Sequence, residues 1–208
     1  MAFEESALTR LRRYREEADA SLTAMREAED AARRLSERLV TGLERTAVLA
    51  REAGFGMETE GDERVMTIRT AAGPFAEARL TLGLVRDAAA ETDEDLMHEE
   101  LSRHTLDPSG YSGRILGWTE AAGEEPCQVF AVYCDGVWKT KGLFVAKARG
   151  KVEDPDEVLH GFCLRILGRL IDLAALTGGA GRSWGDGTYT MEDYLSGVPA
   201  PTRPRWPR

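Results

Sequence analysis

The histidines and cysteines are the residues of this chain best suited to a metal site or to nucleophilic catalysis, and there are three of each. His98 and His104 are six residues apart, whereas two zinc ligands on one face of a helix are four apart. Cys127 and Cys134 are seven residues apart, which places them on opposite faces of a regular strand. Neither pair has the spacing of a metal site, so we expect none.

His160 and Cys163 are three residues apart in an apolar segment, a spacing at which a base and a nucleophile would meet on a helix. A core cysteine packed against a sheet is a much commoner reason for the same pattern. Glycines within 179–181 follow an expected helix, whereas the glycines of a dinucleotide-binding loop follow a strand. We therefore expect no catalytic residue, no cofactor and no metal, in a protein that is not an enzyme.

A cluster of cations stands out in a chain whose formal net charge is −9. The cluster consists of Lys139, Lys141, Lys147, Arg149 and Lys151. One interpretation is a contact with an anion or an acidic partner. The other is protection of an edge strand, because lysines there discourage pairing between sheets. Trp138 alternates to the opposite face and the net charge repels phosphate, so we expect no nucleic-acid partner.

Residues 1–53 have the composition and spacing of a long helix that needs a partner. Apolar or small residues recur at the a and d positions of about six heptads, a pattern typical of a coiled coil. The partner-binding candidates on this segment are Leu11, Tyr14, Met25, Leu35 and Leu39. The pattern fits a single dimerisation helix, or an antiparallel hairpin that breaks near residues 19–21 or Asp30.

An antiparallel sheet is expected after Gly54, a residue type that commonly ends a helix. Turn signals at Gly61-Asp62 and Asp135-Gly136 lie between apolar runs. The expected strands are 56–60, 64–70, 76–84, 112–118, 129–134 and 137–146, with a short helix at 93–105. Asp154-Pro155 then starts a long helix, 155–176, whose broad apolar face would cover the sheet.

The expected fold class is α+β, with a long N-terminal helical, coiled-coil-like arm, an antiparallel sheet of five or six strands, a long C-terminal helix packed on the sheet, and an irregular tail. The expected divisions are 1–53, 54–177 and 178–208. Gly161, Gly168 and Ala175 recur every seven residues, where the N-terminal helix of this or another chain would approach. The layout resembles that of acidic, dimeric secretion chaperones, without a shared motif.

The amino-acid composition indicates a cellular compartment and a type of source organism. Three scattered cysteines are an odd number, which favours reduced thiols in a cytoplasm over a disulfide framework. Of the 27 basic residues, 23 are arginine and four are lysine, which favours a GC-rich bacterial genome. No segment approaches 18 uninterrupted apolar residues, and the acidic N-terminus does not resemble a secretory signal, so we expect no membrane partner.

These patterns predict a non-enzymatic bacterial cytoplasmic interaction protein: an adaptor, scaffold or chaperone-like component. It would assemble through its N-terminal helix, most simply as a dimer, and deleting residues 1–53 would abolish assembly while leaving the sheet folded. Aromatic residues of the tail would provide further docking contacts, namely Trp184, Tyr189, Tyr194 and Trp206. The alternative is a small-molecule-binding or sensory domain, with a pocket between the sheet and helix 155–176. That pocket would be lined by Trp118, Tyr133, Trp138, His160 and Cys163.

Overall fold

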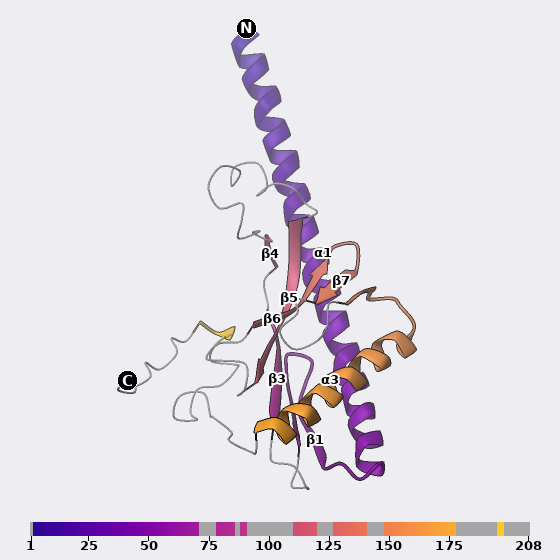
Figure 1. The fold of residues 1–208 in the computed structure, drawn as a ribbon. Coiled ribbons are helices and arrows are strands. Elements are labelled where there is room, and N and C mark those ends of the chain that lie inside the picture. Colours follow the sequence, from indigo (N-terminus) through magenta and orange to yellow (C-terminus); the bar gives the residue numbers. More distant parts are fainter. Residues whose placement is uncertain are drawn as a thin grey trace, which may run out of the picture.

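The computed structural model of the chain combines a long N-terminal helix, an antiparallel sheet and a C-terminal helix (Figure 1). The described residues are 2–70, 78–85, 88–90, 110–119, 127–140, 148–177 and 195–197. The helices are α1 (Ala2–Glu52) and α3 (Asp156–Thr177). The strands are β1 (Met57–Gly61), β2 (Val65–Thr70), β3 (Arg79–Leu84), β4 (Ala89–Ala90), β5 (Tyr111–Thr119), β6 (Cys127–Tyr133), β7 (Val137–Thr140) and β8 (Arg149–Lys151). The predicted α+β class is confirmed, whereas the predicted helix 93–105 and most of the tail lie outside the described residues.

Helix α1 is one continuous helix of 51 residues. Ion pairs between residues four apart, such as Arg13 with Glu17, support its exposed side. The helix ends at Gly54, which has a φ of 90° and donates a hydrogen bond to the Arg51 carbonyl. The long helix is thus confirmed, and the hairpin alternative is wrong. At the predicted break Asp30 stays helical and forms an ion pair with Arg33 at 2.9 Å. Coiled-coil pairing remains a prediction.

The sheet consists of seven strands in the order β1-β2-β3-β5-β6-β7-β8, with the two-residue β4 paired to β5 outside this order. All the pairings are antiparallel. The prediction of five or six strands is wrong, because the expected strand 137–146 ends at Thr140 and β8 then pairs back onto β7. A Cβ atom on Gly150 would lie 2.5 Å from the Trp138 ring, so β8 needs a glycine there.

Two glycines with positive φ close the hairpins that the sequence predicts. Gly61 has a φ of 115° and is the last residue of β1, so the turn lies after it and not at the expected Gly61-Asp62 pair. The Asp62 carboxylate accepts hydrogen bonds from the backbone N–H groups of Arg64 and Val65, at 2.9 and 3.1 Å. Gly136 has a φ of 75° in the turn between β6 and β7. Both turns fix which side chains face the helices.

Both helices cover the same face of the sheet. The register places Gly113, Ile115 and Phe130 on one face, because Gly113 and Ile115 alternate along β5 and Ile115 pairs with Phe130. Gly113 lies against Ala28 of α1, and Phe130 lies against Phe162 of α3. The core therefore fills the space between one sheet face and two helices.

The core crosses the expected boundary between residues 1–53 and 54–177. Buried Leu35, Leu39 and Leu43 of α1 belong to the same hydrophobic cluster as the sheet and α3. At its centre, the rings of Phe130, Trp138 and Phe162 pack edge to face or tilted, with centroids 5.2 to 5.8 Å apart. Removing residues 1–53 would open this core, so the structure argues against the expectation that such a deletion leaves the sheet folded.

Close packing of α1 occurs at two glycines. A Cβ atom on Gly42 would lie 2.8 Å from the Cys163 sulfur of α3, and one on Gly113 would lie 2.5 Å from the Ala28 carbonyl oxygen. The predicted approach of α1 of the same chain to Gly161 and Gly168 is wrong, because a Cβ placed on either would have no atom within 4 Å apart from the adjoining backbone of α3. An approach by the helix of another chain stays a prediction. The two helices meet through the glycine of α1 and not through those of α3.

Arg38 ties α1 to the start of α3. Its Nη2 atom donates hydrogen bonds to the Asp154 carbonyl and to Asp156 Oδ1, both at 2.6 Å, and its Nη1 atom bonds the Val152 carbonyl. Arg34 lies 3.6 Å from Glu153 in the same loop. The Arg38 guanidinium lowers the pKa of Asp156, chiefly through the hydrogen bond. These contacts fix the C-terminal half of α1 to the rest of the protein.

Candidate interaction surface on helix α1

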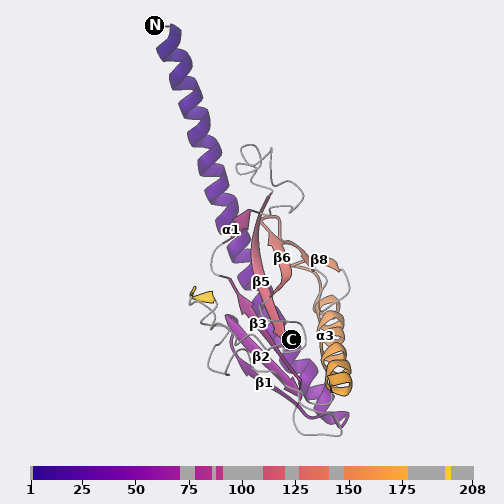
Figure 2. The same cartoon turned by 60° about the vertical axis from the view of Figure 1, so that its left-hand side comes forward.

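Helix α1 has two halves with different surroundings. We call residues 3–20 the projecting half and residues 21–52 the anchored half. The anchored half lies along the sheet and α3, whereas the projecting half extends past the end of the sheet (Figures 1 and 2). Within the described part of the chain, no other helix or strand lies beside the first turns of α1 (Figure 2).

The projecting half exposes large apolar side chains that a solvated helix does not need. Leu11 is 62% exposed and Tyr14 is 59% exposed. Phe3 and Leu8 are exposed as well, and so is Leu22, the second residue of the anchored half. Single exposed apolar residues are normal on a protein surface, but a run of five within 20 residues of one helix makes this side of α1 the candidate contact surface.

Heptad spacing explains why Leu11 and Tyr14 share one side of the helix. Taking Leu11 as position a, Ala18 is the next a, and Ala7 and Tyr14 are d positions. The same series continues into the anchored half through Ser21, Ala28 and the core residues Leu35 and Leu39. One stripe is therefore buried in one half and exposed in the other.

The predicted partner-binding residues divide between the two halves. Leu35 and Leu39 are 0% and 1% exposed, because the sheet and α3 of the same chain cover them. Met25 is half-buried at the border. Leu11 and Tyr14 are the two of this set that stay open to a partner. The tail candidates Trp184, Tyr189, Tyr194 and Trp206 lie outside the described residues.

The structure describes three of the five clustered cations. Lys139 on β7 and Arg149 on β8 are register partners, and both are exposed together with Lys151. Lys139 Nζ lies 4.6 Å from the centroid of the Tyr133 ring. Strand β8 is the last strand in the order of the described residues, so Arg149 and Lys151 lie on an edge strand and Lys139 lies on the strand beside it. This position is the one that the edge-protection interpretation requires, and both interpretations stay predictions. Lys141 and Lys147 are outside the described residues.

The residues of the alternative pocket are not gathered around one space. Trp138 and Cys163 are buried in the core, and Trp138 packs against Phe162 where the pocket was expected. Tyr133 lies on the other sheet face, since Val132 is the partner of Trp138 and Tyr133 follows it. His160 is half-buried against Gly42 of α1, and the side chain of Trp118 is not described.

Burial also settles the state of the Cys163 thiol. Desolvation raises the pKa of Cys163 to about 12, so the thiol stays protonated at neutral pH. A protonated thiol enclosed by two helices does not act as a nucleophile. Among the described residues no group of three or more histidine, cysteine or acidic side chains is placed to hold a metal ion. Likewise, neither described helix has the length and apolarity needed to cross a membrane.

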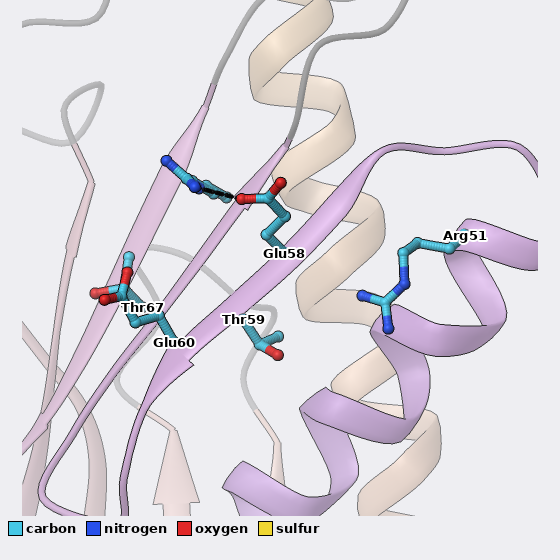
Figure 3. A pocket seen from close by; sticks show the side chains of 6 residues that line it. Arg51, Glu58, Thr59, Glu60 and Thr67 are labelled. Carbon is cyan, nitrogen blue, oxygen red and sulfur yellow. Dashed lines mark hydrogen bonds and ion pairs between the residues drawn. The ribbon is translucent and has the colours of Figure 1, made fainter.

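A polar hollow of about 410 Å³ lies beside the C-terminal end of α1 (Figure 3). Its lining comprises Arg51, Glu58, Thr59, Glu60, Thr67 and Arg69. Arg69 Nε donates to Glu58 at 2.7 Å, and Arg51 donates to the Met57 carbonyl at 2.8 Å. Because both guanidinium groups already have oxygen partners in the same chain, the hollow lacks the converging donors of an anion site.

No family model matches this chain, and neither a curated protein nor a solved structure matches it. Function is therefore inferred from the geometry of the chain itself.

Two features of the surface escaped the sequence-based prediction. Phe3, Leu8 and Leu22 were absent from the candidate set because they flank the a and d positions, at heptad positions e and g. The e and g positions of the same heptads were the available signal. Arg38 had no local signal, since its partners are more than 110 residues away in the sequence.

Proposed function

We propose that this chain is a non-enzymatic interaction protein, an adaptor, scaffold or chaperone-like component of a bacterial cytoplasm, that assembles through the projecting half of α1. The observation that carries the proposal is the change along one apolar stripe, from Leu35 and Leu39 in the core to Leu11 and Tyr14 in solvent. An apolar stripe of this kind is stabilised when a protein surface covers it.

The anchored half supports this proposal as a rigid base. Gly42 and Gly113 allow close packing of α1, and Arg38 fixes it to the loop before α3. A helix held in this way projects its first five turns in a defined direction without the ordering cost that a flexible segment pays on binding. The three scattered cysteines and the arginine-rich composition support the cytoplasmic and bacterial parts of the proposal.

The test compares the full chain with a variant that lacks residues 2–20. Native mass spectrometry should show the full chain in complexes heavier than the 22.9 kDa of one chain, and the truncated chain as a monomer. The truncated chain should keep its melting temperature, since the apolar core begins with Ala24. Complexes that survive the truncation unchanged would contradict the proposal. A monomer that carries a stoichiometric small adduct would favour the small-molecule alternative instead.

A further inference from the structure

The exposed seam on the projecting half is short and has a definite end. Ala7, Leu11, Tyr14 and Ala18 form the seam. Ser21 is the next residue of the series, and it is already buried in the same chain, as is Ala28 one heptad later. A partner helix can therefore follow the seam only over the residues before the sheet begins.

We propose that a second copy of this chain covers the seam, and that the two projecting halves pair antiparallel with Leu11 of each copy against Tyr14 of the other. In this register Ala7 of each copy faces Ala18 of the other, so every layer combines an a with a d position, as antiparallel coiled coils do. This inference rests on the proposed function and specifies its partner and orientation.

Charge complementarity selects this register. Arg10 and Glu17 occupy the g positions that flank the seam, and antiparallel helices bring g positions together. Arg10 of each copy then faces Glu17 of the other, which gives two opposite-charge pairs per dimer. Glu17 is held at the seam edge by a 2.7 Å hydrogen bond from Arg13 of its own helix. A shift of one heptad in either direction would instead oppose Arg10 with Arg10, or Glu17 with Glu17.

The parallel orientation is disfavoured by the same side chains. In a parallel pair the g position of one helix faces the following e position of the other, which opposes Arg10 to Arg15 on both sides. A parallel pair would also place the two sheets at the same position along the axis of the paired helices. The seam side of each helix is buried in its own chain at Ser21 and Ala28, and Gly113 of β5 lies against Ala28, so the two sheets would compete for the same space.

The length of the projecting half matches the antiparallel overlap. When Leu11 faces Tyr14, Glu5 of each copy lies opposite Ala20 of the other, so the overlap of residues 5–20 stays within the two projecting halves. Residues 2–4 would lie opposite Ser21 and the two residues after it, and Ser21 is already buried in its own chain. The apolar overlap therefore ends at Ala20. The two Ala24 residues would lie about 35 Å apart along the helices, well beyond the screening length of about 8 Å at physiological salt. Two bodies of formal charge −9 per chain would then repel each other little.

The experiment exchanges charges in the full-length chain and measures dimer dissociation by sedimentation equilibrium. Arg10→Glu alone and Glu17→Arg alone each replace two attractive pairs by two repulsive ones, and each should weaken the dimer about tenfold. An equimolar mixture of the two variants should form a heterodimer of about wild-type strength, because both facing pairs then combine opposite charges again. Arg12→Glu, a matched charge change at the outward b position, should leave the dimer unchanged. Circular dichroism should show equal helix content in all four chains.

Other results would overturn the inference and separate it from the proposed function. A tighter dimer for Arg10→Glu would show a parallel pair, since that change removes the clash with Arg15. Unchanged dimers in both single variants would show that the seam is not the contact. A full chain that stays monomeric would exclude a second copy as the occupant. In that case, a different protein partner that is lost on deleting residues 2–20 would support the proposed function. If the deletion removes no partner, both the proposed function and the inference are contradicted.

Discussion

The projecting and anchored halves of α1 share one heptad pattern, yet the chain itself covers only one of them. Leu35 and Leu39 belong to the core of the molecule, whereas Leu11 and Tyr14, at equivalent heptad positions, are more than half exposed. The difference comes from where the sheet ends, since nothing in the local composition of the helix changes at residue 21. The comparison teaches that a heptad pattern indicates the need for a partner without indicating which partner.

The largest expected difference is in the free energy of unfolding, when leucine is replaced by alanine in one half of α1 or in the other. Leu35→Ala should lower the free energy of unfolding by about 2–5 kcal/mol, because it leaves a cavity beneath the sheet. Leu11→Ala should change the stability of the monomer by less than about 0.5 kcal/mol, since that side chain is largely in solvent. Urea denaturation at a low protein concentration checks both variants. Equal losses would show that the two halves are equally buried.

The next effect concerns the contact between α1 and β5. Gly113→Ala should destabilise the fold by about 1–3 kcal/mol, because its methyl group would meet the backbone carbonyl of Ala28, which cannot move without shifting the helix. The thermal midpoint gives the measurement, and Gly161→Ala on α3, where space is open, is the matched control. A Gly113→Ala chain as stable as the wild type would mean that α1 does not lie this close to the sheet.

A double-substitution cycle sharpens the packing of the anchored half on α3. Gly42→Ala gains about 1 kcal/mol of helix propensity but crowds the Cys163 sulfur, so we expect a net loss of up to about 2 kcal/mol. In a Cys163→Ala background that sulfur is absent, and Gly42→Ala should then stabilise the chain. Urea denaturation of the four proteins measures the coupling. The same effect in both backgrounds would contradict the contact.

The smallest expected effect is the pH dependence of the Arg38 contact. Arg38 lowers the folded-state pKa of Asp156, so this ion pair stabilises the fold fully above the unfolded pKa of about 3.9. The stabilisation is lost as the pH falls through the lower, folded pKa. Asp156→Asn should therefore be less stable than the wild type at pH 6, with a difference that begins to shrink at about pH 4 and disappears only below the lower, folded pKa. The melting temperatures of both proteins across this pH range provide the measurement. If the difference between them persists in full at about pH 2, below the usual pKa range of an aspartate carboxyl group, the effect has a cause other than the ionisation of Asp156.

Local signals in the sequence predicted most of the elements. The helix boundary at Gly54, the hairpin at Asp135-Gly136 and the helix after Pro155 each depend on residues next to each other in the chain. Strand β8 was missed because its pairing depends on the fit of Trp138 against Gly150, a contact between residues 12 apart. The division of α1 was missed for a similar reason, because the end of the sheet is set by tertiary packing and leaves no mark on the heptads.

The exposed stripe could be predicted in part for the same physical reason. Leu11 and Tyr14, which the structure leaves exposed, were selected through spacing alone, which needs no tertiary information. Leu35 and Leu39 were grouped with them, since identical spacing does not distinguish an internal partner from an external one. For the alternative pocket, the structure shows Trp138 packed against Phe162 beneath α3, so its ring occupies space that it was expected to line, and the small-molecule alternative itself stays a prediction.

Amide hydrogen exchange along α1, measured at several protein concentrations, tests the central contrast most directly. Amides of residues 24–47 should be protected at every concentration, because the core of the same chain covers them. Amides of the projecting half should exchange rapidly in dilute protein and become protected as the chain assembles, and the Arg10→Glu variant should need a higher concentration to reach the same protection. Equal protection of both halves in dilute protein would contradict the account, as would an assembled protein whose projecting half stays unprotected.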